Sequence, residues 1–539
     1  MPSASMTVIS KAFLAAWLSL FALPADALDS DISESMSLSP ELHFLASTRN
    51  VREQQKFAAA IFALPWQRPD CPLLKLMIPS GVAAIVVLCA FALLRRQAKS
   101  IELAEWIRLL ILLPQYICLV GSTIIVIDSY ELAERVGMAP GDSGQLVGLN
   151  WLGAALGFFT VWFALRQDPM IWRKQAKTIC GSGLLVNIMG ILLYVYGVHN
   201  VVYPGSNDVV LWIIKSARIL GGFGQGVVAQ FMVVTIQSLT AKADMGDQMT
   251  RVFVVNALGV GSGPVFAAGA HILAACPSKN FSLVVAPLVQ LVFSCGCLFA
   301  LVALFPDMKQ VELPEEPTIQ STTSGTSSAV TSDIDGPSSV KRRQILIASC
   351  IILFVLRNFV ASGVEVGSAL LLEREFSLDR RLVGVAVGIT FMAVIPVKIV
   401  HQSLKDSLTI VGWFRIFACL AFSGTMLLFQ AVSQMMPGAA ALLLGDAIIF
   451  PSAFMADGLS YGVLMVNVFP DGSLLDKNHS ALFCNVLGMS IGRLSGPWLA
   501  RYQLELLGPA GQNRYALGQM LACAVIVLVF EVGVRPRIK

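Results

Sequence analysis

The sequence predicts an all-α membrane protein whose helices cross the bilayer thirteen times. Of its 539 residues, 56% are hydrophobic and only 13% are charged, and long apolar runs recur along almost the whole chain. A spanning helix needs about 20 apolar residues. Strands of a membrane barrel would be shorter and would alternate in polarity, which these runs do not. Because backbone groups in lipid must bond within their own segment, we expect the runs to be helices.

Composition and motifs argue against several other classes of protein. The net charge of +4 is too small to suggest a nucleic-acid partner. The eleven cysteines are scattered, and none has the spacing of a metal site. No nucleophilic triad or phosphate-binding loop is visible, so we expect neither an enzyme nor a cofactor or metal. The expected partners are the lipid bilayer and a small-molecule or ion substrate, and we expect a monomer.

The N-terminal region precedes the main set of spans. Residues 1–27 resemble a signal peptide, with Lys11 before an apolar stretch and a small-residue cleavage site after it. A signal anchor or a loosely attached amphipathic segment would give a similar pattern. Residues 28–75 are polar and predict an extramembrane segment. The uncharged run that follows predicts an extra transmembrane helix at 76–97.

The remaining runs divide into two sets of six. The first set predicts a six-helix bundle at 105–305, and the second predicts another at 343–539. Residues 306–342 between them are rich in Ser, Thr and Gly, so they predict a disordered cytoplasmic linker. Two six-span halves joined by a linker are a common construction of secondary transporters.

Basic residues indicate which side of the membrane each loop occupies. Lys and Arg cluster after the extra helix, in the loop 166–177, before the second bundle and at the C-terminus. The alternate loops, such as 199–208 and 432–437, contain few of them. The positive-inside rule therefore places the clusters in the cytoplasm and the N-terminus outside, which also agrees with a signal peptide.

The two halves share two weak echoes of sequence. The first is a serine followed by a Glu-Arg pair and then by Leu-Val-Gly, at 129–148 and again at 368–384. The second is an Asn-x-Leu-Gly segment that leads to Ser-Gly-Pro, at 256–264 and again at 485–497. Because both echoes fall at corresponding spans of the halves, they predict an internal duplication.

The fourth span of the first half contains the pattern Arg-x-x-x-Gly-x-Gly, formed by Arg218, Gly222 and Gly224. Glycines let a neighbouring backbone approach closely. A charge inside a span usually faces a cavity or a partner, although Arg218 at a helix start is also compatible with an interfacial anchor.

The fifth span contains a Gly-x-x-x-Gly-Pro pattern formed by Gly259, Gly263 and Pro264. Small residues at this spacing allow tight helix contact, and proline removes one backbone hydrogen bond. Simple packing and a flexible gate both fit this pattern.

These two motifs resemble those of the fourth and fifth spans of the major facilitator superfamily. The stretch 121–269, with Ser129-Tyr130 and the glycine-rich fourth span, looks most similar to one branch. That branch holds the lysosomal proteins linked to neuronal ceroid lipofuscinosis and the SPX-domain vacuolar phosphate transporters. The resemblance implies the major facilitator fold and solute transport. The loop 166–174 lacks the glycines of the superfamily's gating motif, and no SPX domain precedes the spans.

Ionisable residues inside the spans are candidates for substrate binding or ion coupling. Asp446 and Asp457 are eleven residues apart, so they share one helix face. Arg357 precedes Glu365 by two turns and is a candidate partner for it. A buried ion pair or a carboxylate at a helix end would give the same pattern. The candidates for substrate or coupling are Arg218, Gln225, Glu365, Asp446, Asp457, Asp128 and Arg493.

Uncharged polar residues in the spans either line a cavity or pack between helices: Gln225, Gln230, Asn150, Trp151, Asn358, Ser452 and Tyr461. The leading hypothesis is small-solute transport by alternating access, as a uniporter or with proton coupling. An anion channel-like derivative and a non-transporting scaffold or receptor are the alternatives. The membrane is the plasma membrane or an endomembrane such as the vacuole or lysosome.

Overall fold

The structure is a computed structural model that describes residues 72–97, 102–201, 208–241, 244–274, 279–308, 337–436, 438–469, 473–506 and 509–538. All of these belong to one unit, Arg68–Lys539. The predicted signal peptide, nearly all of the predicted extramembrane segment and most of the predicted linker lie outside the described residues.

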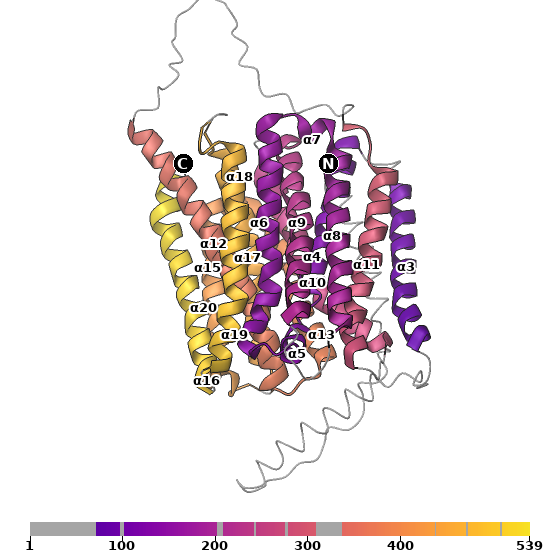
Figure 1. Cartoon of the computed structure of the whole chain (residues 1–539). Coiled ribbons are helices and arrows are strands. Elements are labelled where there is room, and N and C mark those ends of the chain that lie inside the picture. Colours follow the sequence, from indigo (N-terminus) through magenta and orange to yellow (C-terminus); the bar gives the residue numbers. More distant parts are fainter. Residues whose placement is uncertain are drawn as a thin grey trace, which may run out of the picture. The chain divides into compact units, whose positions relative to one another are not determined.

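Helices account for nearly all the described residues, and they run side by side along one direction (Figure 1). Helix α3 spans Pro72–Gln97 and precedes the two bundles. The first bundle consists of α4 (Leu103–Thr123), α5 (Ser129–Arg135), the 3₁₀ turn η2 (Pro140–Asp142), α6 (Ser143–Gln167), α7 (Ile171–Lys174), α8 (Ala176–His199), α9 (Asp208–Ser238), α10 (Met245–Ala274) and α11 (Lys279–Leu304).

The second bundle repeats this arrangement with more interrupted helices. It consists of α12 (Pro337–Arg374), α13 (Arg380–Met392), α14 (Val394–Leu404), η5 (Lys405–Ser407), α15 (Ile410–Met426), α16 (Gln430–Ser433), α17 (Ala440–Val466), α18 (Lys477–Val486), the π-helix η6 (Leu487–Gly492), α19 (Arg493–Leu506), α20 (Pro509–Val529), the π-helix η7 (Phe530–Val534) and the 3₁₀ turn η8 (Arg535–Arg537).

The all-α fold class is confirmed. Among the described residues, 11 helices are long and apolar enough to cross a membrane, and α15 is a shorter apolar helix. The predicted span at 480–501 is covered by α18, η6 and α19 in succession. The chain is therefore an integral multi-pass membrane protein. We call the end of the bundle that carries α7 and the C-terminus the α7 end, and the opposite end the α5 end (Figure 1).

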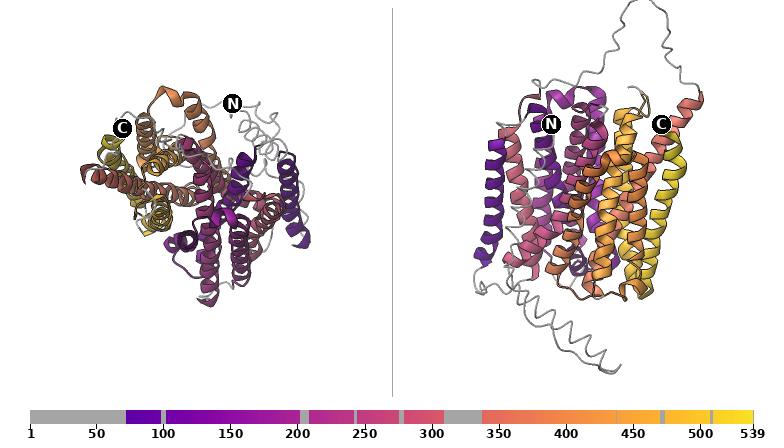
Figure 2. Two further views of the ribbon diagram at one scale, coloured as in Figure 1. Left: turned by 90° about the horizontal axis from the view of Figure 1, so that it is seen from above. Right: turned by 180° about the vertical axis from the view of Figure 1, so that it is seen from behind.

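Helix α3 lies at the edge of the bundle against α11 (Figure 2). The Phe91 and Phe299 rings of these two helices are 5.3 Å apart. Only 11% of the apolar stretch of α3 is buried, whereas 83% of that of α9 is buried. The central helices thus form the core, and α3 is a peripheral addition in the range predicted for an extra transmembrane helix.

Helix α12 is longer than the sequence suggests. It begins at Pro337, so residues 337–342 of the predicted linker are helical instead of disordered. Lys341, Arg342 and Arg343 lie within its first turns, and Arg343 donates a 2.7 Å hydrogen bond from Nε to the Asn467 carbonyl. The basic cluster that marks the start of the second bundle is therefore part of a folded helix end.

The glycines of the fourth-span motif bring three helices into backbone contact. A Cβ atom on Gly222 would collide with the carbonyl of Asn150 in α6, and one on Gly224 would collide with the carbonyl of Gly183 in α8. Gly153 of α6 likewise lies against the carbonyl of Ile219 in α9. Because no side chain separates these backbones, α9 packs closely between α6 and α8.

Pro264 in α10 frees a carbonyl that another helix then uses. Proline has no N–H, so the carbonyl of Val260, four residues earlier, loses its helical donor. The hydroxyl of Thr123 in α4 lies 2.8 Å from that carbonyl oxygen. Gly259 and Gly263 face the same helix at Leu119 and Thr123. This fifth-span motif therefore fixes α4 on α10.

The predicted duplication is visible in the contacts between the halves. A Cβ atom on Gly144 would lie 2.6 Å from the Pro497 carbonyl oxygen, and one on Gly384 would lie 2.6 Å from that of Pro264. Each contact joins the second span of one half to the fifth span of the other. By these contacts, Gly384 corresponds to Gly144. The Leu-Val-Gly echo instead aligns Gly384 with Gly148, one turn later in α6.

We predict that Gly222→Ala destabilises the protein, while Gly269→Ala in α10 does not. The first substitution places a methyl group in steric clash with the Asn150 carbonyl, whereas nothing lies within 4 Å of a Cβ atom on Gly269. Overpacking costs about 1–3 kcal/mol. Thermal unfolding of the two purified variants in one detergent measures the difference. Equal unfolding temperatures would contradict close backbone packing at Gly222.

Candidate functional site

A small cavity lies between the two halves, closer to the α7 end, because Met249 and Tyr461 in its wall lie near the α7-end termini of α10 and α17. Its volume is about 20 Å³, which is roughly the room for one water molecule. Helices α4, α6, α9 and α10 of the first half and α12, α17, α18 and η6 of the second contribute to its walls. Its polar lining residues are Gln115, Asn256, Asn485 and Tyr461.

Carboxamide side chains pair at and beside this cavity. Gln115 Nε2 donates to Asn256 Oδ1 at 3.4 Å within the first half. Asn485 Nδ2 donates to Gln230 Oε1 at 2.7 Å and so joins the second half to the first. Gln115 Oε1 is buried and has no hydrogen-bond partner among the described residues. The cavity therefore presents an unused acceptor.

A charged cluster lies one helical turn from the cavity, on its α5 side. Asn358 follows the cavity residue Phe354 by one turn of α12, and Arg493 follows Met489 by one turn. Asp457 precedes Tyr461 by one turn of α17, which runs in the opposite direction. We call three ionisable residues, Arg357, Asp457 and Arg493, together with Glu365 two turns beyond Arg357 on α12, the charged cluster. All four residues are at most 3% exposed.

Arg357 pairs with Asp457, and not with Glu365 as its position on α12 suggests. Arg357 Nε lies 3.2 Å from Asp457 Oδ1, and Arg357 Nη2 donates to Ser460 Oγ at 2.5 Å. Glu365 is two turns along α12, and eight residues turn the helix by more than two full turns, which separates the two side chains. A pair between helices thus replaces the expected pair within one helix.

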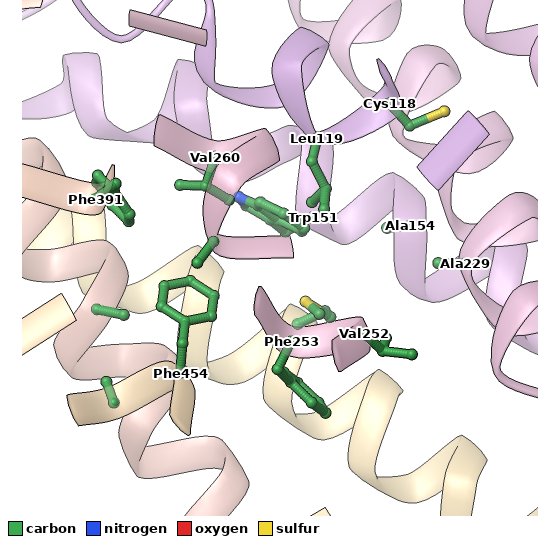
Figure 3. Close-up of a cluster of buried hydrophobic side chains, with 14 of the residues drawn as sticks. Cys118, Leu119, Trp151, Ala154, Ala229, Val252, Phe253, Val260, Phe391 and Phe454 are labelled. Atoms are coloured by element: carbon green, nitrogen blue, oxygen red, sulfur yellow. The ribbon is translucent and has the colours of Figure 1, made fainter. Parts of the chain in front are cut away.

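Arg493 extends from the second half to the first. Its Nε donates to Asn358 Oδ1 at 2.8 Å. Its guanidinium lies 4.5 Å from the ring centroid of Trp151 in α6 and 5.6 Å from that of Phe454. Trp151 and Phe454 belong to the buried side chains drawn in Figure 3. A cation–π contact of this kind is worth about 2 kcal/mol when it is desolvated, so Arg493 helps to hold the halves together.

The π-helix η6 gives Arg493 its position. It spans Leu487–Gly492 and so lies between the cavity and Arg493. Gly488 and Gly492 allow it to approach Phe354 and the Val355 carbonyl of α12. Such bulges within α-helices are frequent at functional sites, and this one is located where the cavity wall becomes the charged cluster.

Glu365 and Asp446 are two further buried carboxylates of the second half. Glu365 Oε1 has no hydrogen-bond partner among the described residues, and the cations that act on it are Arg493 and Arg501. Asp446 accepts a 2.9 Å hydrogen bond from Ser368 on α12. Asp446 and Asp457 thus both face α12, as their spacing predicts, but only Asp457 belongs to the charged cluster.

Within the described part of the chain, Arg218 binds backbone carbonyls and no carboxylate. It donates to the carbonyls of Leu146 at 3.1 Å, Gly121 at 3.3 Å and Ser122 at 2.8 Å. Two of these carbonyls lie at the end of α4, where the helix gives way to turns at 124–128. A cation at a helix C-terminus compensates the unpaired carbonyls there. Gln225 similarly accepts a 2.6 Å hydrogen bond from Asn150, so both residues join helices within the first half.

The halves also touch at the α5 end. Asp128 accepts hydrogen bonds from His271 Nε2, 2.9 Å away, and lies 3.8 Å from Arg380 of the second half. Arg380 also pairs with Glu131. Arg501 reaches from α19 to the hydroxyl of Ser143 and, at 3.3 Å, to the Val126 carbonyl. We call this set of contacts the α5 gate.

Different contacts join the halves at the α7 end. Lys398 Nζ lies 3.2 Å from Asp247 Oδ1. A Cβ atom on Gly462 would lie 2.7 Å from the Gly246 Cα atom. We call this set the α7 gate. The cavity is therefore separated from both ends of the bundle by close contacts between the halves.

The loop 166–174 lacks the glycines of the superfamily's gating motif, and its acidic residue, Asp168, forms its ion pair within the first half. Lys174 Nζ donates to Asp168 Oδ2 at 2.7 Å. This hydrogen bond, with one from the Met170 N–H, holds the pKa of Asp168 below its usual value. Asp168 therefore pairs locally with a residue of its own loop.

Known structures resemble this arrangement. The chain is similar to the xylose transporter XylE from E. coli in a partially occluded inward-open conformation, with a TM-score of 0.54 and 15% identity over 79% of this chain and 97% of that one. The chain has the major facilitator fold. It is also similar to a D-xylose–proton symporter (TM-score 0.54, 14% identity, 78% and 96% covered) and to the nucleoside transporter NupG (0.51, 13%, 80% and 100%). No protein-family model and no curated protein sequence matches the chain.

The sequence identifies some of the central residues and misses others. Tyr461 lines the cavity, and Asn358 and Trp151 contact Arg493 beside it. Ser452 instead lines a second small cavity within the second half, next to Arg357. The sequence does not single out five other residues as site candidates: Gln115, Asn256, Asn485, Arg501 and Lys398. Arg501 and Lys398 lie near the ends of predicted spans, where a basic residue usually reaches the interface, yet both side chains are buried.

The described residues contain no group of three or more His, Cys, Asp or Glu side chains that could hold a metal ion. The chemistry of the site therefore rests on carboxamides, aromatic rings and the charged cluster.

We predict that Arg357→Met costs about 3–5 kcal/mol of stability, because it leaves Asp457 buried without its cation. The double variant Arg357→Met/Asp457→Leu should recover most of this loss, since it removes both charges. Thermal unfolding of the wild type, both single variants and the double variant forms the complete cycle. Additive losses would show that the two side chains do not interact.

Proposed function

We propose that this protein moves a small solute across a membrane by alternating access. The observation that carries the proposal is the cavity between the halves, which two separate gates close. Opening the α5 gate alone or the α7 gate alone would expose the cavity to one side at a time. The similarity to xylose and nucleoside transporters supports this reading through the fold.

The charged cluster is the candidate for coupling. Glu365 and Asp457 are buried carboxylates with nearby arginines, and such groups exchange protons in transporters. Arg493 contacts both the cluster and Trp151 of the first half, so it would connect coupling to the movement of the halves. We assign Arg218 and Gln225 to packing of the first half, Asp128 to the α5 gate, and Asp446 to a secondary role in coupling.

Two alternatives use the same fold. A channel-like derivative would conduct anions without coupling, and a scaffold or receptor would not transport at all. The local pairing of Asp168 is compatible with a channel, since the superfamily's gating motif is altered there. Saturable, counter-transported flux would exclude the channel and the scaffold together. Residence in a lysosomal or vacuolar membrane would support the branch that the sequence resembles.

Alternating access predicts opposite effects of two glycine substitutions on a cysteine placed in the cavity wall at Ala229. Gly462→Val should hold the α7 gate open, because its side chain would meet the Gly246 backbone, and Gly144→Val should likewise hold the α5 gate open, because it would meet the Pro497 backbone. Each should raise labelling of Ala229→Cys from its own side on the order of tenfold, since overpacking costs about 1–3 kcal/mol.

The measurement uses a membrane-impermeant maleimide on sealed vesicles of known orientation. The chain with its native cysteines and without Ala229→Cys provides the background. Two alternating gates would be contradicted if labelling rose from the same side in both variants. They would also be contradicted if labelling rose in neither variant.

Proton coupling predicts that Glu365→Gln loses accumulation driven by a pH gradient while it keeps solute exchange. The amide cannot release a proton, although it preserves the size of the side chain. Glu505→Gln, at the edge of α19 and outside the charged cluster, is the matched control and should behave as the wild type. Flux into proteoliposomes is measured for D-xylose, uridine, phosphate and chloride. Unchanged gradient-driven uptake in Glu365→Gln would remove Glu365 from coupling.

A further inference from the structure

We propose that the cavity binds an uncharged ring compound that bears hydroxyl groups. This assignment rests on the proposed transport function and names the class of solute. It follows from three properties of the cavity wall: the absence of charge, the carboxamides, and the aromatic and thioether side chains.

The wall of the cavity holds no charged side chain among its described residues. A charged solute would lose its hydration there and would meet only neutral dipoles, which is unfavourable. The charged cluster begins one turn away, and on the other side Arg251 pairs with Asp247 on α10. In the charged cluster, Arg357 pairs with Asp457, and Arg493 contacts Asn358 and two aromatic rings. With two arginines and two carboxylates, the cluster offers no excess charge of either sign when all four are ionised.

Three carboxamides give the cavity both donors and acceptors. Gln115 and Asn256 come from the first half, and Asn485 comes from the second. A carboxamide donates through its nitrogen and accepts through its oxygen, which matches a hydroxyl group because it does the same. Gln115 Oε1 is buried and has no partner among the described residues. A hydroxyl donor in the cavity would satisfy it.

Aromatic rings supply an apolar face. Phe253, Phe354 and Tyr461 lie around the cavity with ring centroids 5.7 to 5.9 Å apart. Rings are common in the walls of small-molecule sites, where a few polar groups fix the orientation of the ligand. A ring compound with hydroxyl groups at its edge and C–H groups on its face matches both kinds of wall.

Methionines allow this wall to change shape. Met232, Met249 and Met489 also line the cavity. Methionine side chains are unbranched and adapt to different partners. The present volume of about 20 Å³ is smaller than any sugar ring, so the solute has to displace these side chains as it enters. The aromatic and carboxamide groups, which are held by packing and hydrogen bonds, would keep the chemistry of the site constant.

The test compares three ring compounds that share their hydroxyl groups and differ in charge: D-glucose, D-glucuronate and D-glucosamine. myo-Inositol, D-xylose and inorganic phosphate complete the panel. Binding to the purified full-length chain is measured by the shift in thermal unfolding with probe concentration. We expect at least one uncharged ring probe to stabilise the wild type, and the charged analogues to bind at least about tenfold more weakly.

The variant Gln115→Leu should weaken this binding about three- to tenfold, because it removes hydrogen bonds to an uncharged partner. Gln519→Leu is the matched control, since Gln519 is a buried carboxamide that faces Gly363 and not the cavity. The control should bind as the wild type does. Should Gln115→Leu unfold, Asn485→Leu tests the same wall from the second half.

Stronger stabilisation by phosphate or glucuronate than by any uncharged ring probe would overturn the assignment, as would no stabilisation by the uncharged probes at high millimolar concentration. Flux measured in parallel separates this proposal from transport itself. Saturable flux of a charged solute would keep transport and reject the solute class. Binding of an uncharged ring probe without flux of any solute would keep the class and reject transport.

Discussion

Close contact between helix backbones, made possible by glycine, is the constraint on which the other features of this structure depend. Within the first half, Gly222 and Gly224 place α9 directly against α6 and α8. Between the halves, Gly144 and Gly384 form equivalent contacts at the α5 end. Lipid offers little hydrophobic driving force between helices, so such packing has to supply the association energy. It also brings polar backbone groups close to buried side chains.

Those exposed backbone groups explain where the buried arginines lie. Arg218 and Arg501 belong to different halves, yet both donate to carbonyls between Gly121 and Val126, where α4 ends in turns. A helix end inside a membrane protein needs such donors, because no water is available to it. Arg493 has no comparable carbonyl partner in the part of the chain that the structure describes. Its charge faces an aromatic pair and the carboxylates of the charged cluster, so it is free to respond to their protonation.

The sequence predicts the architecture well because hydropathy and charge act locally. Every predicted span from 76–97 onward contains a described helix, and the duplication appears as paired contacts at Gly144 and Gly384. The site is less predictable because it depends on which helices meet. Arg357 has an acidic residue within two turns of its own helix, and its actual partner, Asp457, is far away in the sequence. Gln115 carries no signal that distinguishes it from a packing residue, and Asn256 and Asn485 stand out only as the first residues of the repeated Asn-x-Leu-Gly segment.

The two gates use interactions of the same kinds. Each gate combines glycine contacts with ion pairs at its edge, such as Arg380 with Glu131 and Lys398 with Asp247. The Arg380–Glu131 pair is partly exposed, and such pairs contribute little, about 0–1 kcal/mol each. Lys398 in the other pair is buried. A solute shifts the populations of the two open states only by its difference in affinity between them. Arg493 beside the charged cluster and Arg501 in the α5 gate both lie on α19, and both act on Glu365. In the proposed mechanism, a change of charge at Glu365 would therefore act on both arginines, and α19 would connect the charged cluster to the gate.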